Sequence, residues 1–106
     1  RNESENAMNV MMIRAQLKAE SLSESEAAAD KMFAAINAAR PDGVKYASMR
    51  LADGVSAVVL LALEDPADNE LQDIPEFREF QEQLPGWLAE PPIVEPLMVI
   101  GSYELF

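Results

Sequence analysis

Apolar residues are densest between Val55 and Leu63, where nine residues include one hydroxyl side chain and no charge. Asp53 and Gly54 precede this run and an acidic stretch with Pro66 follows it, so the run is short for a helix. Its many branched side chains predict a β-strand covered on both faces, although periodicity by itself also permits a helix. One layer of helices covers only one face of a sheet, so a second copy of the sheet is the simplest cover for the other face.

Alternation of residue types between positions 9 and 17 predicts a first strand with two different faces. One face is apolar and consists of Met11, Ile13, Ala15 and Leu17. The other is mixed and consists of Val10, Met12, Arg14 and Gln16. A second strand is predicted over Val44–Leu51, and the two turn residues before the central run predict a hairpin between antiparallel neighbours. A fourth strand is predicted over Leu97–Phe106, which is again almost continuously apolar.

Two amphipathic helices are predicted between these strands. The first follows Ser23 and Glu26, which fit a capping box, with Ser21 and Glu24 as a competing start, and it runs to about Arg40. Its apolar stripe consists of Ala29, Met32, Phe33, Ile36 and Ala39.

The second helix is expected to start at Asp73, with Pro75 in the first turn, where the missing proline N–H has no cost. Its stripe consists of Phe77, Phe80 and Leu84. The helix is expected to break near Pro85, with Trp87 continuing the stripe in a last irregular turn.

The predicted order of strand, helix, strand, strand, helix, strand is that of the ferredoxin-like α+β fold, a βαββαβ unit whose antiparallel four-stranded sheet carries both helices on one face. We therefore expect a single domain over residues 8–106. Residues 1–7 are polar and acidic up to Ala7, so they are expected to form a loose tail or to be an expression remnant. On the sheet face without helices we expect Arg14 and Gln16 beside Tyr46, Ser48 and Arg50, with Ala47, Met49 and Leu51 beneath the helices.

Charge and composition exclude several classes of function. The formal net charge of −11 would repel nucleic acid and anionic lipid, so we expect neither as a partner. With no cysteine and no histidine, the chain has no disulfide, no thiolate nucleophile and neither of the commonest ligands of catalytic metals. No stretch has the length of a membrane span and residues 1–7 do not have the pattern of a signal peptide, so we expect a cytoplasmic protein.

Four stretches of the chain carry a family resemblance. They are Val10–Arg14, the turn Arg40–Gly43 leading into Tyr46–Arg50, the helix start Pro75–Phe80, and Glu90–Pro92 with Leu97–Gly101. Together with the order of elements, they resemble the antibiotic biosynthesis monooxygenase-like (ABM) dimeric α+β barrel family over residues 8–106. The resemblance implies a homodimer whose two sheets meet face to face. It also implies a cavity for a small aromatic or polyketide-like ligand, either between each sheet and its helices or within the barrel.

Some members of that family oxidise phenols or quinols with oxygen and without a cofactor. The resemblance therefore implies a cofactor-independent monooxygenase acting on an aromatic, quinol or polyketide-like metabolite, with no metal. The residues suited to hold a phenolate and to stabilise charge are Tyr46, Arg50 and Trp87 as catalytic residues, with Arg14, Gln16 and Ser48 as ligand-binding residues. The haem-degrading branch fits poorly, because its iron-ligating histidine has no equivalent here.

Each of these residues also has a purely structural interpretation. Arg14 and Arg50 can pair with acidic residues across a dimer seam, and Tyr46 can be a packing residue. Trp87 follows the stripe of the second helix, which favours a core anchor. The alternative function is accordingly a non-catalytic ligand-binding or structural dimer on the same fold.

Overall fold

The computed structural model describes residues 8–105, and the predictions for residues 1–7 and for Phe106 lie outside them. The elements in chain order are β1 (Asn9–Gln16), α1 (Leu22–Ala39), β2 (Val44–Arg50), β3 (Ser56–Leu63), α2 (Pro75–Trp87) and β4 (Ile93–Leu97). Two short 3₁₀ helices, η2 (Ala19–Ser21) and η3 (Glu70–Asp73), precede α1 and α2. The strand order is β2-β3-β1-β4 with all neighbours antiparallel, which confirms the predicted ferredoxin-like α+β fold.

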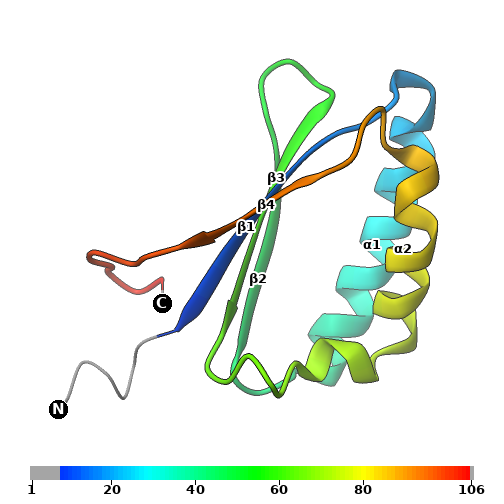
Figure 1. The fold of residues 1–106 in the computed structure, drawn as a ribbon. Coiled ribbons are helices and arrows are strands. Elements are labelled where there is room, and N and C mark those ends of the chain that lie inside the picture. Colours follow the sequence, from blue (N-terminus) through cyan, green and yellow to red (C-terminus); the bar gives the residue numbers. More distant parts are fainter. Residues whose placement is uncertain (1–7, 106) are drawn as a thin grey trace, which may run out of the picture.

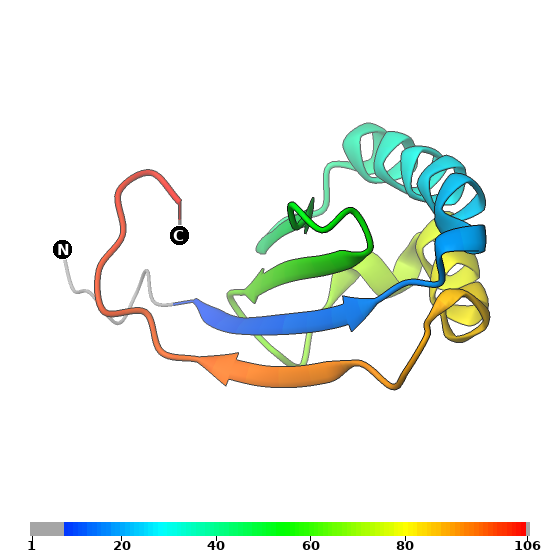
Figure 2. The same ribbon diagram turned by 90° about the horizontal axis from the view of Figure 1, so that it is seen from above.

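Both helices lie on the same face of the sheet (Figure 1). Seen from above, β1 and β4 run side by side and the chain after β4 turns back over the sheet, on the side away from the helices (Figure 2). The central strands are β3 and β1, so the apolar run that dominates the sequence does form a central strand. The molecule thus has a helix layer, a sheet layer and a sheet face without helices, called the open face below.

Strand register decides which residues face the helices, because directly paired residues of antiparallel strands share a face. Val59 of β3 pairs with Ile13 of β1 and with Ser48 of β2. Ala57 pairs with Ala15 and with Arg50 in the same way. These rows lie on the helix side, as predicted for β1.

The core lies between the helices and this side of the sheet, in two clusters of buried side chains. One consists of Met32, Leu71, Ile74 and Phe77. The other consists of Leu17, Trp87 and Leu88. The second cluster closes one end of the domain, where Leu17 forms an isolated bridge with Leu88.

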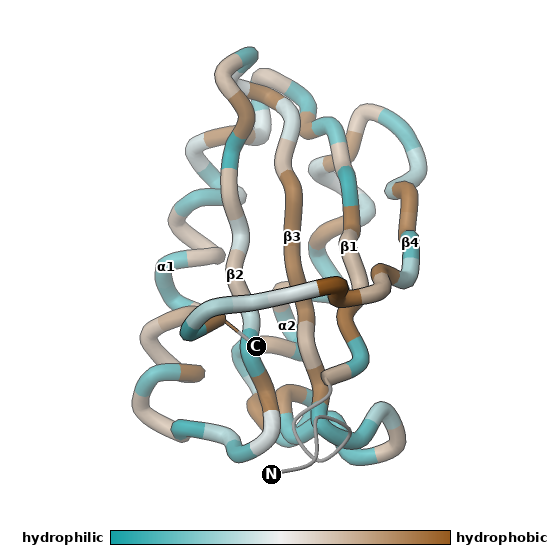
Figure 3. The backbone as a smooth tube through the Cα atoms, turned by 90° about the vertical axis from the view of Figure 1, so that its left-hand side faces the viewer, coloured by the Kyte–Doolittle hydropathy of each residue, from teal (hydrophilic) through white to brown (hydrophobic). Residues whose placement is uncertain are grey.

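The predicted fourth strand over Leu97–Phe106 is wrong, because β4 ends at Leu97. Leu97 pairs with Val10, the second residue of β1, so among residues 8–105 β1 offers only Asn9 beyond this point. Residues 98–105 instead cross the open face in front of β1, β3 and β2 (Figure 3). Val10 and Ala62 are buried although their side chains face this side, while much of the rest of the open face is exposed.

The helix ends differ from the prediction at three positions. Helix α1 begins at Leu22 after Ser21, which is the alternative start, and Ser21 makes no side-chain capping bond. The residue that caps α2 is Ile74 rather than Asp73, while Pro75 occupies the first turn as predicted. Helix α2 also continues through Pro85 to Trp87, because tertiary contacts described below hold its last turn.

Candidate functional site

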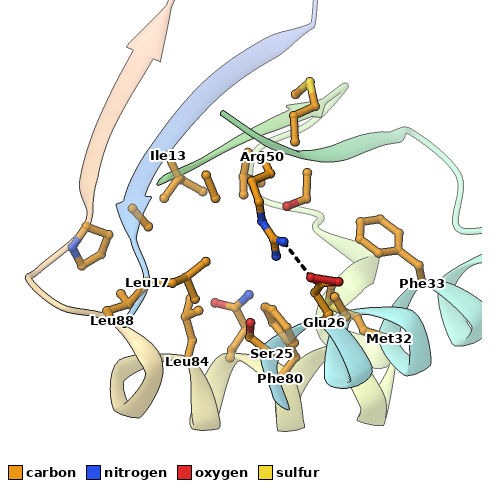
Figure 4. A pocket seen from close by; sticks show the side chains of 18 of the residues that line it. Ile13, Leu17, Ser25, Glu26, Met32, Phe33, Arg50, Phe80, Leu84 and Leu88 are labelled. Atoms are coloured by element: carbon orange, nitrogen blue, oxygen red, sulfur yellow. Dashed lines mark hydrogen bonds and ion pairs between the residues drawn. The ribbon is translucent and has the colours of Figure 1, made fainter. Parts of the chain in front are cut away.

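A cavity of about 530 Å³ lies between the helix layer and the helix side of the sheet (Figure 4). The alternation of β1 and β3 directs small and branched side chains into it, and the apolar stripes of α1 and α2 supply larger ones. Prominent lining residues are Ile13, Leu17, Met32, Phe33, Phe80 and Leu84. The cavity volume is within the range of about 300–1,000 Å³ usual for small-molecule sites, and its walls are mostly apolar, as in such sites.

One ion pair crosses this cavity. Arg50, the last residue of β2, reaches toward α1, and its Nη1 lies 2.6 Å from Oε2 of Glu26 (Figure 4). The side chains of Arg50 and Glu26 remain 37% and 55% exposed, so solvent or a ligand can reach both. Ion pairs of this exposure are worth about 0–1 kcal/mol, so a ligand with a better-matched charge can replace either partner.

Tyr46 forms part of the cavity wall in an aromatic group. Its ring stacks on Phe33 with centroids 5.4 Å apart and meets Phe77 edge-on at 5.8 Å. Desolvation by burial raises the pKa of Tyr46 to about 12. The phenol is protonated at neutral pH, as an unperturbed tyrosine is, and it can donate a hydrogen bond to an oxygen atom in the cavity.

The structure brings three of the six predicted site residues together. Tyr46, Ser48 and Arg50 all line the cavity from β2. They face the helices, not the open face, so the predicted orientation of this strand is wrong. In the observed hairpin register Ala47 pairs with Leu60 and Met49 with Val58, which places these residues on the open face instead.

Arg14 and Gln16 lie on the open face as predicted. The sheet therefore separates them from the cavity, which lies on its helix side. Arg14 pairs with Val58 of β3, and its Nη2 lies 3.2 Å from Oε1 of Glu95 on β4. Gln16 pairs with Ser56 on the same side of the sheet. The prediction that Arg14, Tyr46 and Arg50 share one side is therefore wrong.

Trp87 does not line the cavity and belongs to the core. It is 4% exposed, its ring meets Phe80 edge-on at 5.4 Å, and its indole N–H donates to Oε2 of Glu24 at 2.8 Å. These contacts match the structural alternative for this residue. They also hold the last turn of α2 in helical form after Pro85.

Glu26 and Phe33 are site residues that sequence reasoning missed. The pattern S-E-S-E assigned Glu26 to a capping box, but it lies inside α1, with its carboxylate directed at the sheet. Glu26, Asp30 and Phe33 follow one another at helical spacing and all line the cavity. That spacing beside the apolar stripe is the signal that could have identified them.

In the part of the chain that the structure describes, no three Asp or Glu residues are grouped so that they could hold a metal ion. No helix among those residues is long and apolar enough to cross a membrane. The expected cytoplasmic location stays a prediction.

Comparison with models of protein families and with curated proteins gives no match. Solved structures do match over most of the chain. A candidate antibiotic biosynthesis monooxygenase from Nitrosomonas europaea is 17% identical with a TM-score of 0.73, and the match covers 88% of this chain and 90% of that one. Rv0793 from Mycobacterium tuberculosis is 22% identical with a TM-score of 0.71, with 91% and 98% covered.

SnoaB, a cofactor-independent oxygenase from Streptomyces nogalater, is 16% identical with a TM-score of 0.67. That match covers 92% of this chain and 97% of SnoaB. At these identities the comparison establishes architecture and not activity. The chain therefore has the fold of the antibiotic biosynthesis monooxygenase structures, and the resemblance seen in its sequence is confirmed at the level of the fold.

Proposed function

We propose that the cavity binds a small, flat aromatic or quinol-like molecule and that the protein is a cofactor-independent monooxygenase acting on it. The observation that carries this proposal is a mostly apolar cavity of about 530 Å³ crossed by the Arg50–Glu26 ion pair. Apolar walls favour an aromatic body, and a phenol oxygen gains charge-assisted hydrogen bonds from the guanidinium. The likeness to SnoaB, a cofactor-independent oxygenase, agrees with this chemistry.

Three of the polar groups that line the cavity have distinct roles in this proposal. The Glu26 carboxylate accepts the proton of the phenol, and the guanidinium of Arg50 then stabilises the phenolate. The protonated Tyr46 hydroxyl donates to an oxygen of the substrate. An electron-rich phenolate formed in this way is the species that can transfer electrons to molecular oxygen.

The overall reaction converts a phenol and O₂ into a quinone and water. A ring C–H becomes a carbonyl group with one oxygen atom of O₂, and the other oxygen atom leaves as water. The phenol proton and the ring proton both end in that water molecule. The substrate loses four electrons and O₂ accepts four, so no further reductant is needed.

Oxygen uptake with 1-naphthol as the probe tests this proposal. We expect uptake matched by formation of 1,4-naphthoquinone, with one ¹⁸O atom in the quinone when ¹⁸O₂ is supplied. Binding of 1-naphthol without uptake or quinone would contradict catalysis and favour the alternative of a non-catalytic ligand-binding protein.

Replacement of Arg50 tests the site itself. Arg50→Ala should weaken 1-naphthol binding in calorimetry about tenfold, which corresponds to about 1.4 kcal/mol, and should reduce the turnover rate. Lys31→Ala is the matched control, because it removes an exposed ion pair with Glu79 outside the cavity. Equal affinities of Arg50→Ala and the wild type would show that Arg50 has no part in binding.

We also propose that the protein is a homodimer formed through its open sheet face. Apolar side chains on this face remain exposed, with Met49 at 44% and Ile93 at 49%, and the neighbouring Leu97 at 38%. Exposed apolar patches of this kind mark interaction surfaces in proteins. A second copy with the same face buries both patches at once, as a two-fold axis requires.

A further inference from the structure

A second, smaller hollow of about 320 Å³ lies at the C-terminal end of α1, where the chain turns into β2. Its apolar lining includes Ile36 of α1 and Val44 of β2. Asn37 and Arg40 belong to the same lining, and both residues are exposed. Polar and apolar surface contribute about equally to this lining, which suits a ligand that carries a charged group on a small apolar body.

The aromatic pair Phe33 and Tyr46 lines this hollow and the main cavity alike. With the two rings stacked at 5.4 Å, the pair stands between the two spaces. The smaller hollow therefore shares this aromatic wall with the main cavity.

Arg40 differs from the other arginines of the described chain in its partners. Arg14 and Arg50 form ion pairs, and Arg78 donates to a backbone carbonyl, whereas the guanidinium of Arg40 has no protein partner among residues 8–105. The chain has a net charge of −11, which repels anions over most of the surface. A guanidinium without a protein partner among these residues can form charge-assisted hydrogen bonds with an anion at this hollow.

Arg40 also has an unusual backbone conformation. It is the C-cap of α1, with φ 51° and ψ 58°, in the left-handed region that glycine or asparagine normally occupies at this position. A residue with a Cβ atom is disfavoured in this region. Glycine would therefore suit the backbone better at position 40, whereas the arginine places a positive charge at the C-terminal end of α1, where the helix dipole favours a cation.

We propose that this hollow binds a small aromatic or branched monocarboxylate. The carboxylate lies on Arg40 and the Asn37 amide, and the apolar body lies against Ile36 and Val44. The ligand is distinct from the one proposed for the main cavity, and the inference does not depend on monooxygenase activity. A ligand in this hollow contacts the Phe33 and Tyr46 wall from the side opposite the main cavity.

A titration with 4-fluorobenzoate, followed by ¹⁹F NMR, tests the proposal, with the uncharged 4-fluorobenzyl alcohol as the matched ligand. Arg40→Gly should raise the Kd of 4-fluorobenzoate at least tenfold and leave that of the alcohol within twofold. The glycine suits the left-handed backbone, so the variant should fold with unchanged circular dichroism. Lys45→Gln is the matched protein control, because Lys45 is an exposed cation of β2 that pairs with Ala62 and faces the other side of the sheet.

Several results would overturn the proposal. The first is the absence of saturable 4-fluorobenzoate binding to the wild type. The second is an equal rise of the Kd of both ligands in Arg40→Gly, and the third is a rise of the Kd of 4-fluorobenzoate in Lys45→Gln as large as that in Arg40→Gly. Methyl NMR locates the site: shifts should appear at Ile36 and Val44, and shifts confined to Val59 and Leu84 would place the acid in the main cavity instead. Binding of 1-naphthol by Arg40→Gly should be unchanged, so failure of 1-naphthol binding contradicts only the proposed function of the main cavity.

Discussion

The side chain of Tyr46 is packed between the helix layer and β2, with its ring against Phe33 and Phe77. The next two residues on the same face of β2, Ser48 and Arg50, are polar and line the main cavity together with Tyr46. Burial disfavours the ionised phenolate and raises the pKa from 10.0 to about 12. A single residue thus links the packing of the core to the chemistry of the cavity and to the pH dependence of stability.

Because the pKa of Tyr46 is higher in the folded state, the unfolded chain loses this proton first as the pH rises. The contribution of the protonated Tyr46 to the free energy of unfolding is fully present below pH 10 and is lost between pH 10 and about 12. The loss amounts to about 2 kcal/mol at the upper end of this range. The free energy of unfolding, measured by urea denaturation, should therefore fall more steeply between pH 9 and 11.5 for the wild type than for Tyr46→Phe. Tyr103→Phe is the control, since Tyr103 is 86% exposed, and a Tyr46→Phe variant with the slope of the wild type would refute this assignment.

At the scale of elements, the β2–β3 hairpin is held by its turn. The Asp53 carboxylate accepts hydrogen bonds from the backbone N–H groups of Val55 at 2.9 Å and Ser56 at 2.8 Å. Together with the Ser56 hydroxyl, these bonds lower the pKa of Asp53. Gly54 has φ +81°, which residues with a Cβ atom rarely adopt. The turn fixes the register that places Arg50 and Tyr46 toward the helices.

Replacement of Gly54 and of Gly86 by alanine should change the free energy of unfolding in opposite directions. Gly54→Ala should destabilise the protein by about 1 kcal/mol, because alanine is strained at a positive φ. Gly86→Ala, inside α2, should stabilise it by about 0.5–1 kcal/mol through higher helix propensity. At neither position would the added Cβ atom meet another atom within 4 Å, so packing does not enter. Urea denaturation measures both changes, and the same sign for both would refute this explanation.

At the scale of the whole molecule, the open sheet face is the surface through which we propose that the protein assembles. Residues 98–105 cross part of this face, and several of their apolar side chains are themselves exposed, among them Met98 and Ile100. The helices and loops of one copy leave the rest of the face uncovered. We therefore expect that this face and the C-terminal segment contact a second copy.

Ala47→Glu tests this expectation, because Ala47 is exposed on β2 and pairs with Leu60 on the open face. Each copy would then bury an unpaired carboxylate in the proposed interface, while a single copy should tolerate the exposed carboxylate. The wild type should sediment at about twice the chain mass of 11.7 kDa, and the variant at the mass of one chain. Ala34→Glu, on the exposed side of α1, should remain dimeric. A wild-type protein that is monomeric at micromolar concentration would rule out this assembly.

The sequence by itself determined the order and type of the elements, the face pattern of β1 and the hairpin. These features depend on local signals, namely strict alternation in β1, two turn residues before β3 and apolar stripes at helical spacing. It also pointed to Tyr46, Ser48 and Arg50 as residues of one site, because alternate residues of one strand share a face whichever way the strand is turned.

Only the tertiary structure decided which way β2 is turned. Both of its faces mix polar and apolar residues, with Lys45, Ala47 and Met49 on one and Tyr46, Ser48 and Arg50 on the other, so hydropathy does not choose between them. Likewise, the end of α2 depends on the contacts of Trp87 with Phe80 and Glu24, and the end of β4 depends on the length of β1 beside it. The Arg50–Glu26 pair joins residues 24 positions apart, and a contact of that kind exists only after the helix has packed on the sheet.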